Sequence, residues 1–230
     1  MFEPGRRCPV SSLATSPFIH AQGNSSASIL VLPVPSAPIL FEQIEEHSQH
    51  FEDGALAAET RKTKVYRDSS GRLRIESSIP ATDIIQLIDP VAGSRVILLS
   101  TEAEKIGYRL PWPKSSEVKF TIFAPVGNES AGDPSRKWTS TTESLGTRTI
   151  EGIEFEGIRF VQAAEGEPAL IKTIEQWYSA DQKLIGLIVS SSPSETHMAR
   201  IQNVHREEPD STLFAVPTGY KIFDHLPSSD

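Results

Sequence analysis

The sequence lacks every motif that would attach a known reaction to it. No Gly-x-Ser-x-Gly elbow, phosphate-cradling glycine loop or His-Glu-x-x-His pair occurs in its 230 residues. The six histidines do not show the spacing of three or four zinc ligands. Three close carboxylates (Glu151, Glu154, Glu156) lie on an alternating stretch, which favours a solvated strand face over a catalytic pair. We therefore predict no catalytic residues, no metal site and no cofactor.

Long apolar runs and an excess of basic residues are also missing. No apolar run approaches the ~18 residues of a transmembrane helix, so we predict no transmembrane segment. The net charge of -8 argues against nucleic acid as a partner, since neutralisation of phosphates supplies most of that affinity. The single Cys8 excludes an intrachain disulfide. The apolar residues 29–34 are too short and too far along for a signal peptide, and none is visible in this chain.

The chain is rich in extended segments bounded by turn residues. Their number predicts a mainly β (α+β) fold, an antiparallel, strongly curved sheet of about eight to eleven strands with few short helices. A single helical turn is expected over residues 212–214, after the acidic and proline residues 208–210. Residues 150–161 change the parity of their apolar positions at Gly157, which predicts a β-bulge or a tight bend there.

Composition predicts one domain with loose ends. Residues 1–36 are rich in Ser, Pro, Ala and Gly and are predicted to be a poorly ordered lead-in. A single domain is expected over residues 37–223, followed by a loose tail at residues 224–230. The proline-rich residues 109–146 are predicted to form a long loop within that domain.

A predicted hairpin around residues 68–71 carries a basic cluster. If its four-residue loop sets the register, Arg67 lies opposite Arg72, and Arg67, Arg72 and Arg74 share one face. Like charges at such a spacing are mildly destabilising, so the group needs solvent or an anion. An exposed, solvated hairpin is one interpretation. A docking patch for anionic lipid headgroups or an acidic partner is the other.

Three predicted strands are apolar at both parities: residues 84–88, 96–99 and 184–189. Such strands bury both faces, yet the sequence predicts no long helix to cover the second face. The cover could be the loop 109–146, the N-terminal segment, a second subunit or a bound apolar ligand. Strand parity alone leaves open which residues point inward. The candidate ligand-binding residues are Ile85, Leu87, Ile97, Leu99, Phe155, Phe160, Trp177 and Leu187.

Several stretches resemble one family. They are residues 145–152, the Glu-Gln-Trp-Tyr of residues 175–178 followed by Asp181, the apolar residues 184–189, and the closing residues 208–220. Together they resemble the outer-membrane lipoprotein carrier and its relatives, which include the sensor domain that regulates an envelope-stress anti-sigma factor. Residues 66–72 and 89–93 are similar to those of exported acidobacterial proteins. The resemblance implies a curved antiparallel half-barrel with an apolar concave face.

The resemblance, together with the apolar strands and the missing catalytic motifs, predicts a function and a location. The function is a non-enzymatic binding module of the bacterial cell envelope, a carrier or sensor that takes an acyl chain or other apolar ligand. A structural or protein-interaction role, with an envelope protein as partner, is the alternative. An enzyme on the same half-barrel is a third possibility, because a fold does not determine function. The location implied is periplasmic or otherwise extracytoplasmic.

Overall fold

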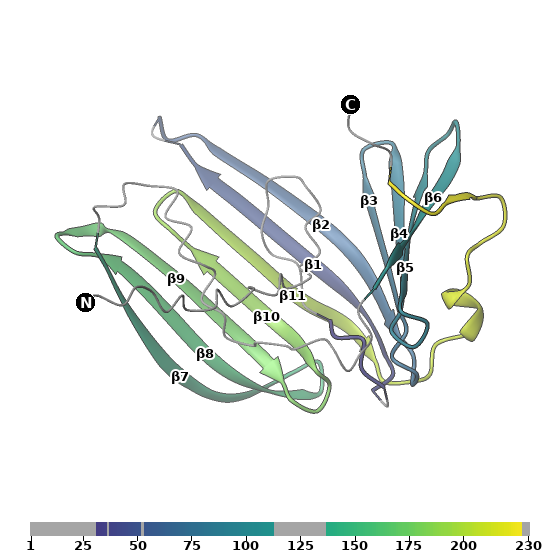
Figure 1. Ribbon diagram of the computed structural model, residues 1–230. Coiled ribbons are helices and arrows are strands. Elements are labelled where there is room, and N and C mark those ends of the chain that lie inside the picture. Colours follow the sequence, from purple (N-terminus) through teal and green to yellow (C-terminus); the bar gives the residue numbers. More distant parts are fainter. Residues whose placement is uncertain (1–30, 36, 52, 113–136, 227–230) are drawn as a thin grey trace, which may run out of the picture.

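The computed structural model describes residues 31–35, 37–51, 53–112 and 137–226, and these form one curved sheet (Figure 1). A 3-10 helix, η1, spans Ser211–Phe214. The strands are β1 (Ile39–His50), β2 (Leu56–Arg67), β3 (Leu73–Ile79), β4 (Thr82–Asp89), β5 (Ser94–Ser100), β6 (Lys105–Pro111), β7 (Trp138–Ile150), β8 (Ile153–Ala164), β9 (Glu167–Ser179), β10 (Leu184–Ser191), β11 (Glu195–His205) and β12 (Lys221–Phe223).

Two antiparallel meanders meet at their first and last strands. The sheet order is β12-β6-β5-β4-β3-β2-β1-β11-β10-β9-β8-β7, so β1 pairs with β11 and joins the meander of β1–β6 to that of β7–β11. The short β12 adds to β6 in parallel. The mainly β, antiparallel prediction and the helical turn near residue 212 are confirmed, but the described sheet has twelve strands instead of eight to eleven.

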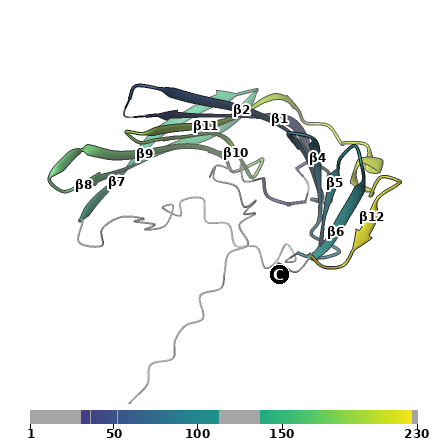
Figure 2. The same cartoon turned by 90° about the horizontal axis from the view of Figure 1, so that it is seen from above.

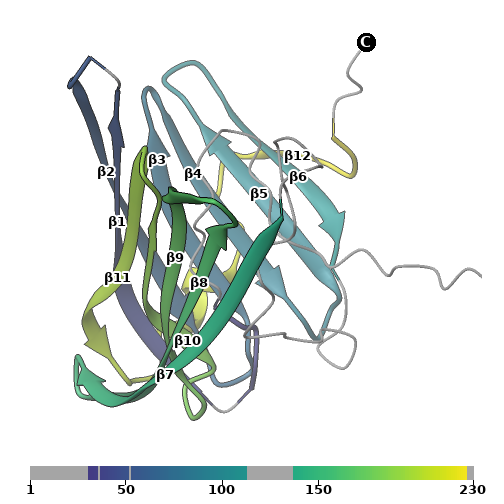
Figure 3. The same ribbon diagram turned by 90° about the vertical axis from the view of Figure 1, so that its left-hand side faces the viewer.

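The sheet bends into an arc, and two chain segments mark its faces. Figure 2 shows the start of the described chain inside the arc and the C-terminal segment with η1 and β12 outside it. Arg67 of β2 donates hydrogen bonds to the carbonyls of Ala37 and Leu32, so the odd-numbered residues of β2 face the concave side. Figure 3 shows β7–β9 in front of β4–β6, as a bent sheet requires. The strand register then identifies which residues of the other strands face the concave side.

The C-terminal segment covers the convex face of β4 and β5. Leu87, Val96 and Leu98 form a buried cluster there, and Tyr220 and Ile222 pack against it. The second apolar face of these strands is therefore covered by the end of the chain, an element that is not among the four covers expected from the sequence. Residues 218–223 belong to the fold in this way, and β12 ends at Phe223.

The larger core lies where the two meanders meet. It contains Ile39 and Phe41 of β1, Val65 of β2 and Phe155 of β8, with Ile153, Trp177, Leu184 and Ile201 around them. Two glycines make room for the rings of this core. A Cβ on Gly157 would lie 2.6 Å from the Trp177 ring, and one on Gly186 would lie 2.5 Å from the Phe155 ring.

Several local predictions are corrected by the structure. The predicted loop 109–146 overlaps β6 at one end and β7 at the other, while residues 113–136 lie outside the described part of the chain. Of the predicted lead-in, residues 1–30 and 36 also lie outside it, but Val31 bridges Leu184 and packs against the core. The bulge expected at Gly157 lies in the partner strand, where the β7 register shifts between Ser144 and Gly146.

Candidate functional site

The concave face of β4–β6 is largely aliphatic but also carries Gln86 and Arg95. Register places Ile84 beside Leu99 and Leu99 beside Ile106, and the next row runs from Gln86 through Ile97 to Tyr108. The side chains of these two rows are partly exposed. We call the concave residues Ile84, Ile97, Leu99, Ile106, Tyr108 and Leu110 the β4–β6 flank.

The other side of the arc carries a second aliphatic surface. Glu45 of β1 pairs with Ala199, Ala199 with Ile188, Ile188 with Gln176 and Gln176 with Ile158, so this row shares the concave face. The adjacent row runs from His197 through Ser190 and Ile174 to Phe160. We call Ile158, Phe160, Ile174 and Ile188 the β8–β10 flank, and each of them is partly exposed.

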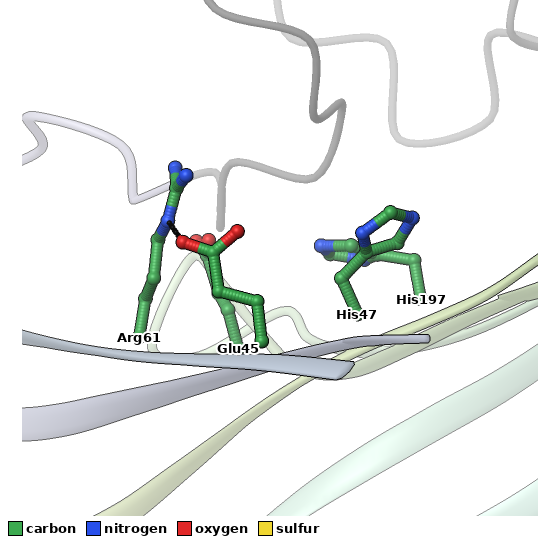
Figure 4. Close-up of a pocket in the computed structure, with 5 residues that line it drawn as sticks. Glu45, His47, Arg61 and His197 are labelled. Atoms are coloured by element: carbon green, nitrogen blue, oxygen red, sulfur yellow. Dashed lines mark hydrogen bonds and ion pairs between the residues drawn. The ribbon is translucent and has the colours of Figure 1, made fainter. Parts of the chain in front are cut away.

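A polar pocket lies between the two flanks, on β1, β2 and β11. It is a small, shallow depression that is open to solvent. Its lining residues are Glu45, His47, Glu59, Arg61 and His197. In Figure 4 the labelled side chains project from the same face of the sheet into this pocket. Strand alternation explains the grouping, because register pairs Glu45 with Arg61 and pairs His47 with both Glu59 and His197.

The contacts within the pocket are unequal. The Arg61 Nε lies 2.7 Å from a Glu59 carboxylate oxygen, which forms a salt bridge. Glu45 accepts a hydrogen bond from the side-chain amide of Gln43. The His47 Nε2 lies 3.6 Å from a carboxylate oxygen of Glu195, and the His47 and His197 ring centres are 6.1 Å apart. Arg61 is thus already paired, whereas Glu45 has a neutral partner.

Burial shifts the pKa of two groups in opposite senses. It raises the pKa of Glu45, partly offset by the hydrogen bond from Gln43 and by the charge of Arg61. Burial, with the neighbouring His47, lowers the pKa of His197. The salt bridge with Arg61 instead lowers the pKa of Glu59. At neutral pH the pocket therefore holds an uncharged His197 imidazole beside carboxylates, and it is rich in hydrogen-bond acceptors.

His197 has an unfilled hydrogen-bonding position. The residue is 8% exposed, and its Nδ1 has no hydrogen-bond partner within the described chain. Such an atom costs free energy unless something pairs with it. No group of three or more His, Cys, Asp or Glu side chains suited to a metal ion occurs among the residues that the structure describes.

Comparison with known proteins gives loose structural likenesses. A LolA superfamily protein from Nitrosomonas europaea is 7% identical with a TM-score of 0.34, over 80% of this chain and 92% of its own. A putative outer membrane lipoprotein-sorting domain from Vibrio parahaemolyticus is 8% identical with a TM-score of 0.31, over 76% and 88%. The Pseudomonas aeruginosa MucA/MucB complex matches at 10% identity and a TM-score of 0.34, over 79% and 56%.

These names include the lipoprotein-carrier group that the sequence resembles, but the superpositions are too loose to assign a function. No family model and no curated protein matches the chain, so its similarity to exported acidobacterial proteins stays a prediction. In the described residues, no helix has the length and apolar character needed to cross a bilayer.

The predicted ligand-binding residues fall into three places. Ile97, Leu99 and Phe160 lie on the concave flanks. Leu87 is buried in the convex cluster, and Ile85 packs against that cluster. Phe155, Trp177 and Leu187 belong to or pack against the larger core, and Arg148 lies over the Trp177 ring. The apolar residues of β4 and β5 therefore lie on two faces, a convex face that is covered and a concave face that is open.

The three predicted patch arginines do not share a face. Arg67 pairs with Leu73, and Tyr66 with Arg74, so the predicted hairpin register was wrong by one residue. Asp68 causes the difference, because its carboxylate binds the backbone and side chain of Arg72 and holds that residue in the turn. Arg74 lies on the convex face, donating to Glu76 and to the Leu213 carbonyl. Arg67 is fully buried.

The sequence pattern does not assemble the polar pocket. Its residues come from two separate stretches, and His47 and His197 meet only through the β1–β11 ladder. Strand parity was the one available signal, since Glu45 and His47 alternate on the same side of β1.

Proposed function

We propose that the protein is a non-enzymatic binding module of the bacterial cell envelope that holds an elongated ligand with an apolar chain against its concave face. The observation that supports this most is the difference between the two faces of β4–β6. The convex face is covered by Tyr220 and Ile222, whereas the β4–β6 flank retains partly exposed aliphatic side chains. An apolar concave surface of this kind is a usual site for an apolar ligand.

The energetics suit an acyl chain. Each CH₂ group transferred from water to an apolar surface contributes about 0.8 kcal/mol before entropy losses. Both flanks lie on the same concave face, so one chain could contact either of them. The resemblance to lipoprotein carriers at residues 145–152 and 175–178 supports an extracytoplasmic location for this activity. Fractionation of cells expressing the complete gene tests that location, and a purely cytoplasmic pool would contradict it.

Ligand binding is tested by native mass spectrometry of gently purified protein and by titration with a fluorescent fatty acid. Leu99→Lys places a charge on the β4–β6 flank, and Phe160→Lys places one on the β8–β10 flank. We expect at least one of them to weaken binding by about tenfold or more. Val91→Lys is the matched control, because Val91 is 74% exposed in a turn. Absence of both a co-purified small molecule and saturable binding by the wild type would refute the proposal.

A protein-interaction role is the second candidate, and β7 favours it. This strand is thirteen residues long, ends the sheet order and is exposed along most of its length. A long exposed edge strand can accept an added strand from a partner. In that case, native mass spectrometry would show a stoichiometric complex with a polypeptide and no small ligand, and Leu99→Lys would behave as the wild type.

A further inference from the structure

We infer that the polar pocket binds the primary ammonium head group of an amphipathic ligand, with Glu45 and His197 as its acceptors, while the ligand's apolar chain lies on the β8–β10 flank. This inference rests on the proposed function and names the ligand class for the same concave face. Three observations support it: the charge balance, the unpartnered imidazole and the row of residues that leads from the pocket to the flank.

The charge balance favours a cation. Glu45 and Glu59 line the pocket, and Glu195 contacts His47 at its rim, whereas Arg61 is the one guanidinium among the lining residues. Arg61 is engaged by Glu59 at 2.7 Å. Lys62 and Lys64 point to the convex face by strand alternation, and Lys62 pairs there with Glu42. An anionic head group would therefore meet uncompensated carboxylates in this pocket.

Glu45 is the lining carboxylate that forms no salt bridge with Arg61. It faces Arg61 across the strand pair, but the guanidinium binds Glu59, and Glu45 receives its hydrogen bond from the neutral Gln43. Burial of this side chain raises its pKa, which agrees with an anion that is poorly stabilised by its surroundings. A charge-assisted hydrogen bond from an ammonium group would stabilise it directly.

His197 supplies the second acceptor once its imidazole turns toward the ligand, because its Nδ1 is itself shielded from solvent. Figure 4 shows its imidazole lying close to the sheet beside that of His47 and extending toward Glu45. The residue is more than nine-tenths buried, and its Nδ1 is without a hydrogen-bond partner in the described structure. A neutral imidazole has one acceptor nitrogen, and an ammonium group has three donors. The two acceptors thus suit two of the three ammonium donors, and the third is left to water.

The strand register connects the pocket to an apolar surface. From His197 the row continues through Ser190 to Ile174 and Phe160, on strands about 4.8 Å apart. A chain that leaves the head group along this row passes from polar to apolar side chains within two strands. This order, with polar groups at one end and aliphatic groups at the other, matches an amphipathic molecule.

Probes with one chain and different head groups test the inference. The full chain is titrated with dodecylammonium, dodecanol, dodecanoate and dodecyltrimethylammonium below their micelle concentrations, with isothermal titration calorimetry as the readout. We expect dodecylammonium to bind about tenfold or more tightly than dodecanol and dodecanoate. Dodecyltrimethylammonium, which has the charge but no N–H donor, should fall below dodecylammonium.

Variants identify the pocket as the source of that preference. Glu45→Gln should weaken dodecylammonium binding about tenfold and dodecanol binding much less, which removes the preference for dodecylammonium. Glu46→Gln is the matched control, since it makes the same change on the same strand but on the convex face. His197→Phe keeps a ring of similar size and should reduce dodecylammonium binding alone. Circular dichroism and thermal unfolding establish that each variant is folded.

The outcomes separate the two proposals. If all four probes bind equally well and Glu45→Gln changes nothing, the inference is wrong and the proposed function stands. If dodecanoate binds most tightly, the pocket takes an anion and the inference is overturned. If no probe binds saturably, both the inference and the apolar-ligand function fail.

Discussion

The Nη2 of Arg67 lies 2.7 Å from the backbone carbonyl oxygen of Gln182, and this hydrogen bond joins β2 to the turn between β9 and β10. The same guanidinium donates to the carbonyls of Ala37 and Leu32 at 2.6 and 3.0 Å. Burial lowers the pKa of Arg67 to about 10, so the side chain is still charged at neutral pH. One buried cation thus ties the N-terminal segment and both meanders together.

Replacement of Arg67 should destabilise the fold. Arg67→Met leaves three backbone carbonyls without their donor, and we expect a loss of about 2–4 kcal/mol in the free energy of unfolding. Urea denaturation followed by circular dichroism measures this loss. Arg109→Met is the control, because Arg109 pairs with Asp224 on the surface and such pairs contribute little. Equal stabilities for the two variants would show that the Arg67 hydrogen bonds are unimportant.

Two glutamates of β1 should respond to pH in opposite directions. Hydrogen bonds from Lys62, Gln202 and Asn203 lower the pKa of Glu42 from 4.5 to about 2. The stabilisation that Glu42 contributes is therefore complete above pH 4.5 and is lost as the pH falls toward 2. Glu42→Gln should lower stability at neutral pH and flatten the acid limb of the stability curve.

Burial raises the pKa of Glu45, so ionising this carboxyl costs the folded state stability at neutral pH. That cost is present above the raised pKa and disappears as the pH falls to 4.5. Glu45→Gln should therefore increase stability at neutral pH. Unfolding curves across the acid and neutral range measure both variants, and a Glu45→Gln protein less stable than the wild type at neutral pH would contradict this assignment.

A side chain at Gly157 should clash with Trp177. The added Cβ of Gly157→Ala would lie 2.6 Å from the ring, and overpacking of this kind costs about 1–3 kcal/mol. The check is a double-mutant cycle with Trp177→Leu, measured by urea denaturation. In the Trp177→Leu background, Gly157→Ala should cost clearly less. A cost independent of Trp177 would place its origin in the backbone instead.

The C-terminal cover should be needed for the fold. Ile222→Asp puts a charge against the cluster of Leu87, Val96 and Leu98, and we expect a loss of about 1–3 kcal/mol. Thermal unfolding measures stability, and binding of an apolar dye reports exposure of the convex face. Thr218→Asp, at an exposed position of the same segment, is the control and should change neither. Wild-type dye binding by Ile222→Asp would mean that the segment is dispensable as a cover.

The local parts of this fold could be read directly from the sequence. Alternation of side chains and turn residues such as those at 68–71 and 89–93 are short-range properties, and they predicted the antiparallel sheet and these hairpin turns. The helical turn at η1 was predictable for the same reason, because Asp210 caps it from one residue away. The apolar character of both parities in β4 and β5 was equally plain, since it depends on composition alone.

Only the tertiary structure decided which apolar residues of β4 and β5 face the covered convex side and which face the open concave side. A strand that is apolar on both faces carries no local signal of which face points toward the concave side. The reason is that apolar residues occupy both its odd and its even positions. Ile85 nevertheless packs against the covered convex cluster, whereas Ile97 lies on the open concave flank. The C-terminal segment causes this difference in exposure, because it packs on the convex side only. It lies far from β5 in the sequence, so no local pattern in β5 could indicate the contact.

The polar pocket was decided in the same way. Its residues come from β1, β2 and β11. His47 and His197 face each other because β1 pairs with β11 where the two meanders meet. Asp68, by holding Arg72 in the turn, set the β2–β3 register that separates Arg67 from Arg74. Cross-strand partners depend on the packing of the whole sheet, since a shift of one residue moves every side chain to the other face. The sequence alone therefore indicated strands and turns over much of the chain, although not the part of β7 that lies within the predicted loop 109–146. Long-range pairing determined which side chains meet.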